Sequence, residues 1–472
     1  MINKLIRVPF FIVMLIFLVF DLAHSFRQYY ATPLDGDLPG SVVPAADVVP
    51  ILTHPLGVAA LTADTLYPNP NKYFSHAVIY YYFNKFVPFL QHFVSPIDSI
   101  YLACSVAKLL IQILLLWILS VWITGKFSVF RLDSMFALCL STVFFQAYGY
   151  RSSIGIIDPS VTYCFFYALP ILFLLLYFTP VWLSYRFSKS IPNSFLFLWI
   201  VMAPIVALSG PLNPGIALVV CFLWTFDRLV KRKAFSPLQL KCLIPIAFFS
   251  SYSLFLGQYN SLNIAPQVDV LHRYMLLPKG LWEIISGRFT WPWLFIMLGL
   301  NAVVLKRYCA DDSSNALKEL KWIGVFALCY LCLLPLGGYR DYRPFIIRYD
   351  TIMPITVMII FWLVRSSVLI MNHLIIDIRR HRVVAALVFF YCLASVVIFE
   401  NADNMKFENN TQQRCWIGEL DRSDETIIEV PQNVLIATWK PVENPNDSYL
   451  VSQMLLKYNI ISTNKLFVNK QQ

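Results

Sequence analysis

A series of long apolar runs limits what this chain can fold into more than any other feature of its sequence. An α-helix needs about 17–25 mostly apolar residues to cross a bilayer, and hydropathy indicates about eleven such runs here. The chain has a mean hydropathy of +0.63 and is 58% hydrophobic, values typical of a polytopic membrane protein. We predict an all-α fold with about eleven transmembrane helices. The runs cover residues 8–23, 97–123, 134–150, 161–185, 195–208, 214–226, 241–256, 291–305, 322–336, 352–364 and 383–399.

The basic residues predict the orientation of these runs. They fall in every second connection, which is the positive-inside pattern, and this places the N-terminus in the cytoplasm and the C-terminus outside. We therefore interpret the net charge of +10 as a topology signal and expect no nucleic-acid partner. The clusters are Lys126/Arg131, Arg186/Lys189, Arg228/Lys231/Arg232/Lys233, Lys306/Arg307/Lys318/Lys321 and Arg379/Arg380/Arg382.

Two further local features bear on the topology. Lys4 and Arg7 precede the first run, and Ala23-His24-Ser25 resembles a signal-peptide cleavage site; we favour an uncleaved anchor over a cleaved signal spanning residues 1–25. Residues 195–208 and 214–226 are short, with a strong turn between them, so they are either two short spans or two half-helices.

The chain divides into a transmembrane part, residues 1–400, and an outer C-terminal tail, residues 401–472. Residues 26–97 form a first outer loop much longer than an ordinary connection. Its many aromatic side chains favour a folded cap with amphipathic helices over disorder. The tail is rich in Asn and Asp and predicts a small α+β unit, with strands at 426–430 and 434–439 and a helix at 448–458.

Within the first outer loop, Asp35 and Asp37 flank a glycine that would let the chain turn sharply, so both carboxylates could face one site. Carboxylates so spaced could hold a divalent metal such as Mg²⁺ or Mn²⁺, or one could act as a general base. The alternative is a structural Asx-type turn followed by Pro39. Asp47 and Asp64 are the reserve acids of the loop.

A second cluster lies in the late outer segment 337–350, where basic residues are not favoured by topology. Arginine forms bidentate contacts with phosphate, and tyrosine can stack on a sugar or hydrogen bond to it, so the cluster predicts a phosphate-binding segment. The alternative is ion pairing with Asp341 and Asp350 together with anchoring to lipid headgroups. The candidate residues are Tyr339, Arg340, Tyr342, Arg343 and Arg348.

Weaker candidates have no ligand spacing. His272 and Arg273 lie together in the outer segment 258–290, and His54 and His76 lie in the first loop. For each histidine, interfacial hydrogen bonding is the alternative to acid–base or binding chemistry. Lys108 is the one cation well inside a run, where it either has a function or extends toward the interface.

This layout resembles the GT-C superfamily of polytopic glycosyltransferases, which use polyprenyl-phosphate sugars. The matching features are the long first outer loop with Asp35 and Asp37, the many spans, the Arg/Tyr-rich late outer loop and the outer C-terminal piece. The resemblance implies a lipid-linked sugar donor among membrane lipids, an Asp of the first loop as the base, basic residues on the lipid phosphate, and inversion at the anomeric carbon. It also implies a lipid, glycan or protein acceptor, and we expect a bacterial inner membrane. The alternatives are a lipid-glycan flippase or other transporter, and a polysaccharide polymerase.

Overall fold

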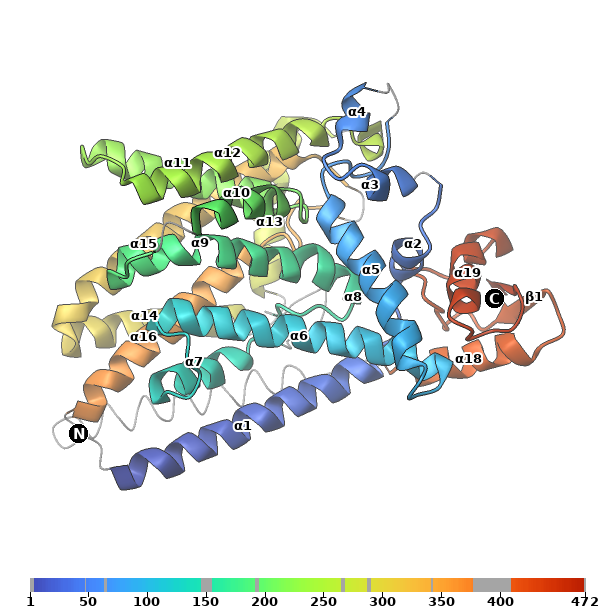
Figure 1. Cartoon of the computed structure of the whole chain (residues 1–472), viewed down its shortest axis with the longest axis horizontal. Helices are drawn as coiled ribbons and strands as arrows, with labels where there is room; N and C mark the ends of the chain where they lie inside the picture. The colour runs from blue at the N-terminus through green and yellow to red at the C-terminus, as the bar shows by residue number, and fades with distance from the viewer. Residues whose placement is uncertain are drawn as a thin grey trace.

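Long helices lying side by side form the body of the protein (Figure 1). The computed structural model describes residues 4–46, 48–62, 66–145, 155–191, 195–264, 268–286, 290–340, 343–376 and 409–470. Within these residues, seven helices are long and apolar enough to cross a membrane. They are α1 (Lys4–Ala31), α6 (Pro96–Thr124), α8 (Val161–Tyr163) continuing through a π-helical turn (Cys164–Ala168) into α9 (Leu169–Phe187), α11 (Asn213–Val230), α12 (Pro237–Gly257), α15 (Ala310–Leu333) and α16 (Met353–Ile376).

The chain is therefore a multi-pass membrane protein, mostly helical as predicted, but the described part does not reach eleven spans. Helices α13 (Val270–Ser286) and α14 (Thr290–Tyr308) are bent by 84° and count as an eighth span only if taken together. Helices α7 (Leu132–Thr142) and α10 (Phe195–Ala207) are apolar but shorter. The run predicted at 383–399 lies outside the described residues.

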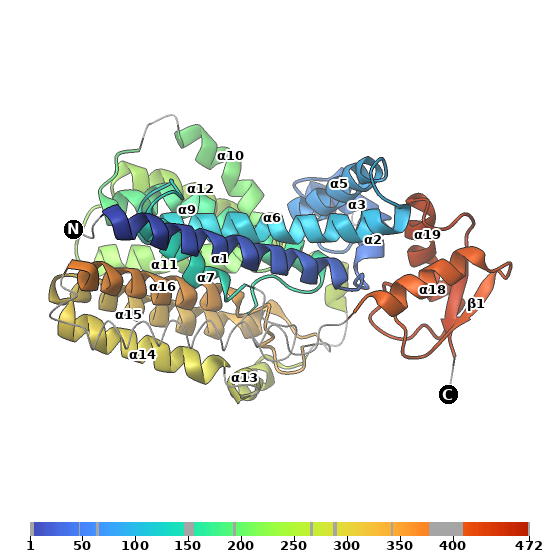
Figure 2. The same ribbon diagram turned by 90° about the horizontal axis from the view of Figure 1, so that it is seen from below.

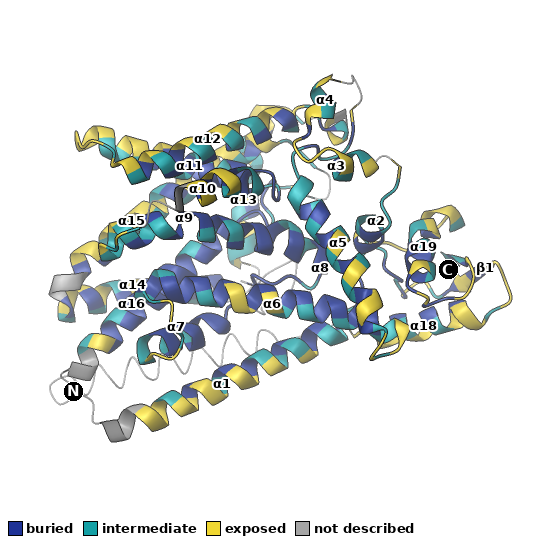
Figure 3. Cartoon of the chain, in the orientation of Figure 1, coloured by how far each residue is buried: buried dark blue, intermediate teal, exposed yellow. Residues whose placement is uncertain are grey.

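Burial separates the inner helices from the outer ones. Of the most apolar window of α16, 89% is buried, whereas only 22% of that of α1 is buried (Figure 3). Large apolar side chains such as Ile16 and Phe20 stay exposed along α1, as expected for contact with lipid.

Local signals explain several helix ends. Ser95 caps α6 by accepting the N–H of Asp98, and Gly125, at a φ of +71°, ends it in the left-handed conformation. The turn predicted between residues 208 and 214 is present and separates α10 from α11. At its centre Gly210 has a φ of +70°, and a Cβ there would lie 2.4 Å from the carbonyl oxygen of Phe166.

The first outer loop is folded, and it lies at one end of the bundle beside the C-terminal unit (Figure 1). It contains three short helices, α2 (Leu38–Val42), α3 (Val49–Thr53) and α4 (Val58–Thr62), and one longer helix, α5 (Tyr73–Leu90). The N-terminus lies at the opposite end, and α6, α9 and α11 run toward that end, where the basic connections follow them.

The C-terminal unit combines α18 (Thr411–Arg422), β1 (Ile427–Val430), α19 (Tyr449–Lys457) and β2 (Leu466–Asn469), and it covers the end of the bundle near α2 and α5 (Figure 2). The strands pair in parallel, with Ile427 opposite Leu466. Helix α19 matches the predicted helix, but the strand predicted at 434–439 is wrong. Ala437 has a φ of +48°, so the backbone leaves the extended conformation there.

Candidate functional site

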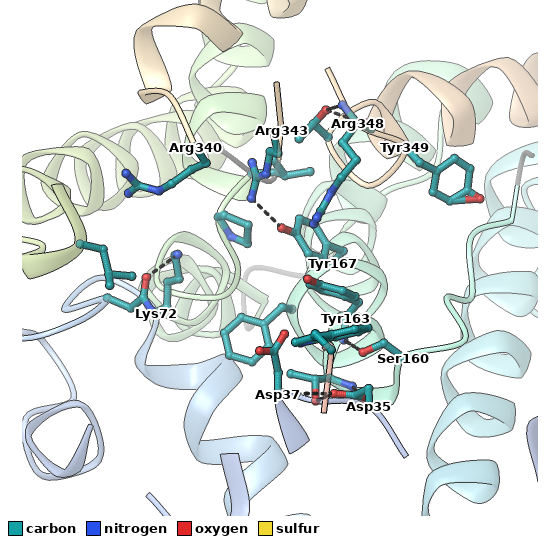
Figure 4. A pocket seen from close by; sticks show the side chains of 18 of the residues that line it. Asp35, Asp37, Lys72, Ser160, Tyr163, Tyr167, Arg340, Arg343, Arg348 and Tyr349 are labelled. Carbon is teal, nitrogen blue, oxygen red and sulfur yellow. Dashed lines mark hydrogen bonds between the residues drawn. The ribbon is translucent and has the colours of Figure 1, made fainter. Parts of the chain in front are cut away.

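A cavity of about 2630 Å³ lies at the end of the bundle that carries the first loop and the C-terminal unit. Its walls include the turn before α2, the start of α5, α8 with the π-helical turn, the end of α12, residues 343–349 and the tail. Ligand pockets commonly measure about 300–1,000 Å³, so this one has room for more than one substrate. Asp35 and Asp37 lie on one side of it, and Arg340, Arg343 and Arg348 lie across from them (Figure 4).

Asp35 has a structural role. Its carboxylate is buried, and Oδ1 accepts the N–H groups of Asp37 at 3.1 Å and Leu38 at 3.0 Å. Thr162 supplies two more donors, its hydroxyl to Oδ1 at 2.9 Å and its N–H to Oδ2 at 3.2 Å. The Asx-type turn is therefore the correct interpretation for Asp35, which attaches the first loop to α8.

Asp37 is placed differently. It precedes α2 and lines the cavity. Unlike Asp35, it is exposed to solvent. The pKa of Asp37 is raised above its ordinary value, mainly by burial and in part by the negative charge of Asp35. Trp439, Arg348 and Tyr163 lower this pKa, but by less. A raised pKa makes a carboxylate a stronger base, so of the two acids Asp37 is the one suited to accept a proton.

Gly36 is required by the approach of the tail. A Cβ at this position would lie 2.6 Å from the backbone nitrogen of Trp439 and 2.7 Å from its ring. The glycine between the acids therefore lets residues of the C-terminal unit reach the Asp turn. The sequence interpretation missed Trp439, because it placed this residue at the end of a strand.

The opposite wall carries a cluster of cations, Lys72, Arg340 and Arg343. Arg343 donates to the Tyr167 hydroxyl at 3.2 Å, Arg340 to Asn263 Oδ1 at 3.1 Å, and Lys72 to Asn69 Oδ1 at 2.6 Å. Burial, followed by the charges of Arg343 and Arg340, lowers the pKa of Lys72 to about 7. Three positive charges on one wall, two of which lower the pKa of the third, favour the binding of an anion between them.

Lys72 was also missed from the sequence, although a signal was present. It is the only Lys or Arg between Arg27 and Lys85, within the loop that carries the acids.

Arg348 lines the cavity, as a phosphate-binding residue would, but it also forms the ion pair with Asp350 that was the alternative. Its guanidinium forms a bidentate ion pair with Asp350, one bond measuring 2.9 Å, and lies 5.1 Å from the centre of the Tyr163 ring. Burial would raise the pKa of Asp350, but the hydrogen bond from Arg348 and the charge of Arg343 hold it below its ordinary value. Arg348 is thus fixed above Tyr163, with part of its charge neutralised.

Two other predicted residues, Arg273 and His76, line the cavity, but contacts with the protein itself occupy their side chains. Arg273 donates to the carbonyl oxygens of Val268 at 2.7 Å and Pro335 at 3.0 Å, so it holds the wall together. His76 packs edge-on against Phe166, and burial, with the charge of Lys72, lowers its pKa to about 3, which keeps its ring neutral.

The remaining candidates lie away from the cavity lining. Lys108 is buried in α6 and donates to the carbonyl oxygen of Pro159, and His54, His272 and Tyr339 are not among the lining residues. Tyr342 and the reserve acids Asp47 and Asp64 lie outside the described residues.

The proposed metal pair fits a metal poorly. The oxygens of Asp35 accept four hydrogen bonds that a cation would have to displace, which leaves Asp37 as the only member of the pair available to the cavity. In the described ranges, no group of three or more His, Cys, Asp or Glu side chains could hold a metal ion.

The site thus offers one open carboxylate with a raised pKa, facing a cluster of cations across a large cavity. Such an arrangement can take a proton from one ligand while it stabilises negative charge on another. Comparison of this chain with protein-family models, with curated proteins and with solved structures finds no match.

Proposed function

We propose that this protein is a membrane glycosyltransferase that moves a sugar from a polyprenyl-phosphate donor to an acceptor hydroxyl. The observation that carries the proposal is that one cavity joins Asp37 to Lys72, Arg340 and Arg343. Asp37 and Lys72 come from the first loop, whereas Arg340 and Arg343 come from a segment that begins 268 residues after Lys72. The cavity lies at the end of the bundle opposite the basic connections, which favours the extracytoplasmic face of a bacterial inner membrane.

The geometry suggests how the residues would act. Asp37 accepts the proton of the acceptor hydroxyl as its oxygen forms a bond to the anomeric carbon. The bond from that carbon to the phosphate oxygen breaks, and its electron pair leaves with the lipid phosphate. Lys72, Arg340 and Arg343 stabilise the developing negative charge. A single displacement of this kind inverts the anomeric carbon, by analogy with glycoside hydrolysis.

A flippase is the second candidate, because the bent pair α13 and α14 and the short helix α10 resemble the broken helices of transporters. A flippase would carry the lipid-linked sugar across the bilayer intact, whereas a transferase cleaves it. A polysaccharide polymerase would cleave the donor too, and would differ only in using a growing glycan as acceptor.

The cationic wall gives the first prediction. Arg340→Ala and Arg343→Ala should each raise the KM for the polyprenyl-phosphate donor about 10- to 100-fold, because a hydrogen bond to a charged group contributes about 1.5–3 kcal/mol. Steady-state kinetics with a radiolabelled donor would measure this change. Arg131→Ala is the matched control, since Arg131 pairs with Asp133 at an exposed position at the start of α7. Unchanged KM values in both cavity variants would contradict a phosphate role.

Lys72 gives a prediction about pH. With a pKa of about 7, it is charged below neutrality and loses its proton above. The donor is a phosphate diester whose charge stays constant over this range, so its affinity should fall by up to about tenfold per pH unit above pH 7. Isothermal titration with a non-transferable donor analogue, repeated from pH 6 to 9, would measure the change.

Two Lys72 variants separate this cause from others. Lys72→Arg keeps the charge and should remove the pH dependence, whereas Lys72→Met should bind weakly at every pH. A pH profile shared by wild type and Lys72→Arg would show that another group titrates.

A further inference from the structure

The tail contributes an aromatic side chain to the cavity, next to Asp37. The ring of Trp439 lies nearly parallel to that of Tyr163, with centroids 5.8 Å apart and an angle of 29° between their planes. Trp439 lines the cavity and is 44% exposed. Its backbone nitrogen and ring also approach the turn that carries Asp37 so closely that a Cβ at Gly36 would lie 2.6–2.7 Å from them. A flat apolar surface thus lies beside the turn that carries the candidate base.

Polar side chains of the tail surround this ring. Asn409, Gln412 and Asn433 line the same cavity, and each amide can both donate and accept hydrogen bonds. Thr438, also in the lining, has a buried hydroxyl oxygen with no hydrogen-bond partner in the described part of the chain. The tail therefore presents one aromatic surface edged by uncharged hydrogen-bonding groups.

The tail is fixed firmly in this position. The Gln413 amide hydrogen bonds to the Leu34 N–H at 2.7 Å and to the Tyr101 hydroxyl at 2.6 Å. Arg414 pairs with Asp98 at 2.6 Å and lies 4.0 Å from the centre of the Tyr101 ring. Gln413 also donates to the carbonyl oxygen of Leu435 at 2.9 Å, four residues before Trp439, and the Trp439 ring itself packs on Tyr163. These contacts order the segment before any ligand binds, and this lowers the entropic cost of binding.

We propose that the tail forms a carbohydrate subsite, in which a sugar ring of the acceptor stacks on Trp439 and presents a hydroxyl to Asp37. The acceptor role rests on the proposed function, whereas carbohydrate binding itself does not. A sugar ring has apolar C–H faces and a rim of hydroxyl groups. The apolar face matches an aromatic ring, and the rim matches amide and hydroxyl partners. A lipid acceptor would need a wholly apolar groove, and a peptide would need backbone partners.

The test measures sugar binding to the full-length protein in lipid nanodiscs, because maltoside and glucoside detergents would compete for such a site. The probes are maltose, cellobiose, lactose and chitobiose, with a serine-containing tetrapeptide and a short polyprenol as non-carbohydrate probes. Saturation-transfer NMR and isothermal titration would report binding without any donor present. We expect at least one disaccharide to bind, and neither the peptide nor the polyprenol to do so.

Variants assign the binding to Trp439. Trp439→Ala should weaken the best disaccharide about tenfold, equal to about 1.4 kcal/mol. Trp439→Phe keeps a flat ring but lacks the indole N–H near Asp37, so it should stay within about threefold of wild type. Trp282→Ala is the matched control, because Trp282 is 69% exposed on α13 and does not line the cavity. Melting temperatures would verify that each variant is folded.

Several results would overturn the proposal: no binding of any disaccharide, equal binding by Trp439→Ala, or equal losses in the Ala and Phe variants. The last would mean that Trp439 acts only through its indole N–H and not through its flat ring. Failure of the proposed function is distinguishable. In that case no donor is consumed, while Trp439-dependent sugar binding persists in wild type and in Asp37→Asn.

Discussion

Asp37→Asn is expected to lower the rate of sugar transfer about 10²- to 10⁴-fold, the usual contribution of a general base. The amide has nearly the same shape as the carboxylate but cannot accept the hydroxyl proton. Because Asp37 faces the cavity rather than the core, the variant should fold normally and still bind the donor. Single-turnover assays with saturating donor would separate the chemical step from binding.

The pH dependence of sugar transfer provides a second test of Asp37 as the base. The base acts when deprotonated, and burial raises the pKa of Asp37. Transfer in wild type should therefore increase as pH rises through that raised pKa, and the residual activity of Asp37→Asn should lack this limb. Full activity in Asp37→Asn would remove Asp37 as the base.

Asp35→Ala is expected to destabilise the protein by about 3 kcal/mol or more, because each hydrogen bond to a charged group contributes about 1.5–3 kcal/mol. The substitution removes the side-chain acceptor of three N–H groups and of the Thr162 hydroxyl, and only the Leu38 N–H keeps a backbone acceptor, the carbonyl oxygen of residue 35 at 3.3 Å. It also releases the first loop from α8. Thermal or denaturant unfolding of the purified protein would measure the loss.

Asp37→Ala is the matched comparison, because it changes the same turn two residues away. It should alter stability by much less, since the side chain faces the cavity. Substitution of Asp35 should thus mainly lower the free energy of unfolding, whereas substitution of Asp37 should mainly lower the rate of sugar transfer. Equal stability losses in the two Ala variants would contradict this division.

The sequence could predict the membrane fold and the two groups of candidate residues, because hydropathy and charge clusters are local features. It could not separate Asp35 from Asp37. The donors that occupy Asp35 come partly from Thr162, 127 residues later, and no local pattern reveals that contact. The need for glycine at position 36 also cannot be read from the local sequence, because it comes from the close approach of Trp439 in the C-terminal unit.

Composition also says little about where an element ends. Residues 434–439 have strand-like composition, but their backbone turns at Ala437. Of the eleven predicted spans, α7 and α10 are apolar but too short, α14 counts only together with the bent helix α13, and the run 383–399 lies outside the described residues. Hydropathy reports composition, and it does not show where a helix ends.

The most direct test follows the donor itself. The purified protein, reconstituted in liposomes, would be incubated with a panel of radiolabelled polyprenyl-phosphate sugars and candidate acceptors, and the lipid products would be separated. The result we expect is release of polyprenyl phosphate and appearance of the sugar on an acceptor, with inverted anomeric configuration and with no such product from Asp37→Asn. Movement of an intact donor across the bilayer without cleavage would contradict the proposal and would identify a flippase.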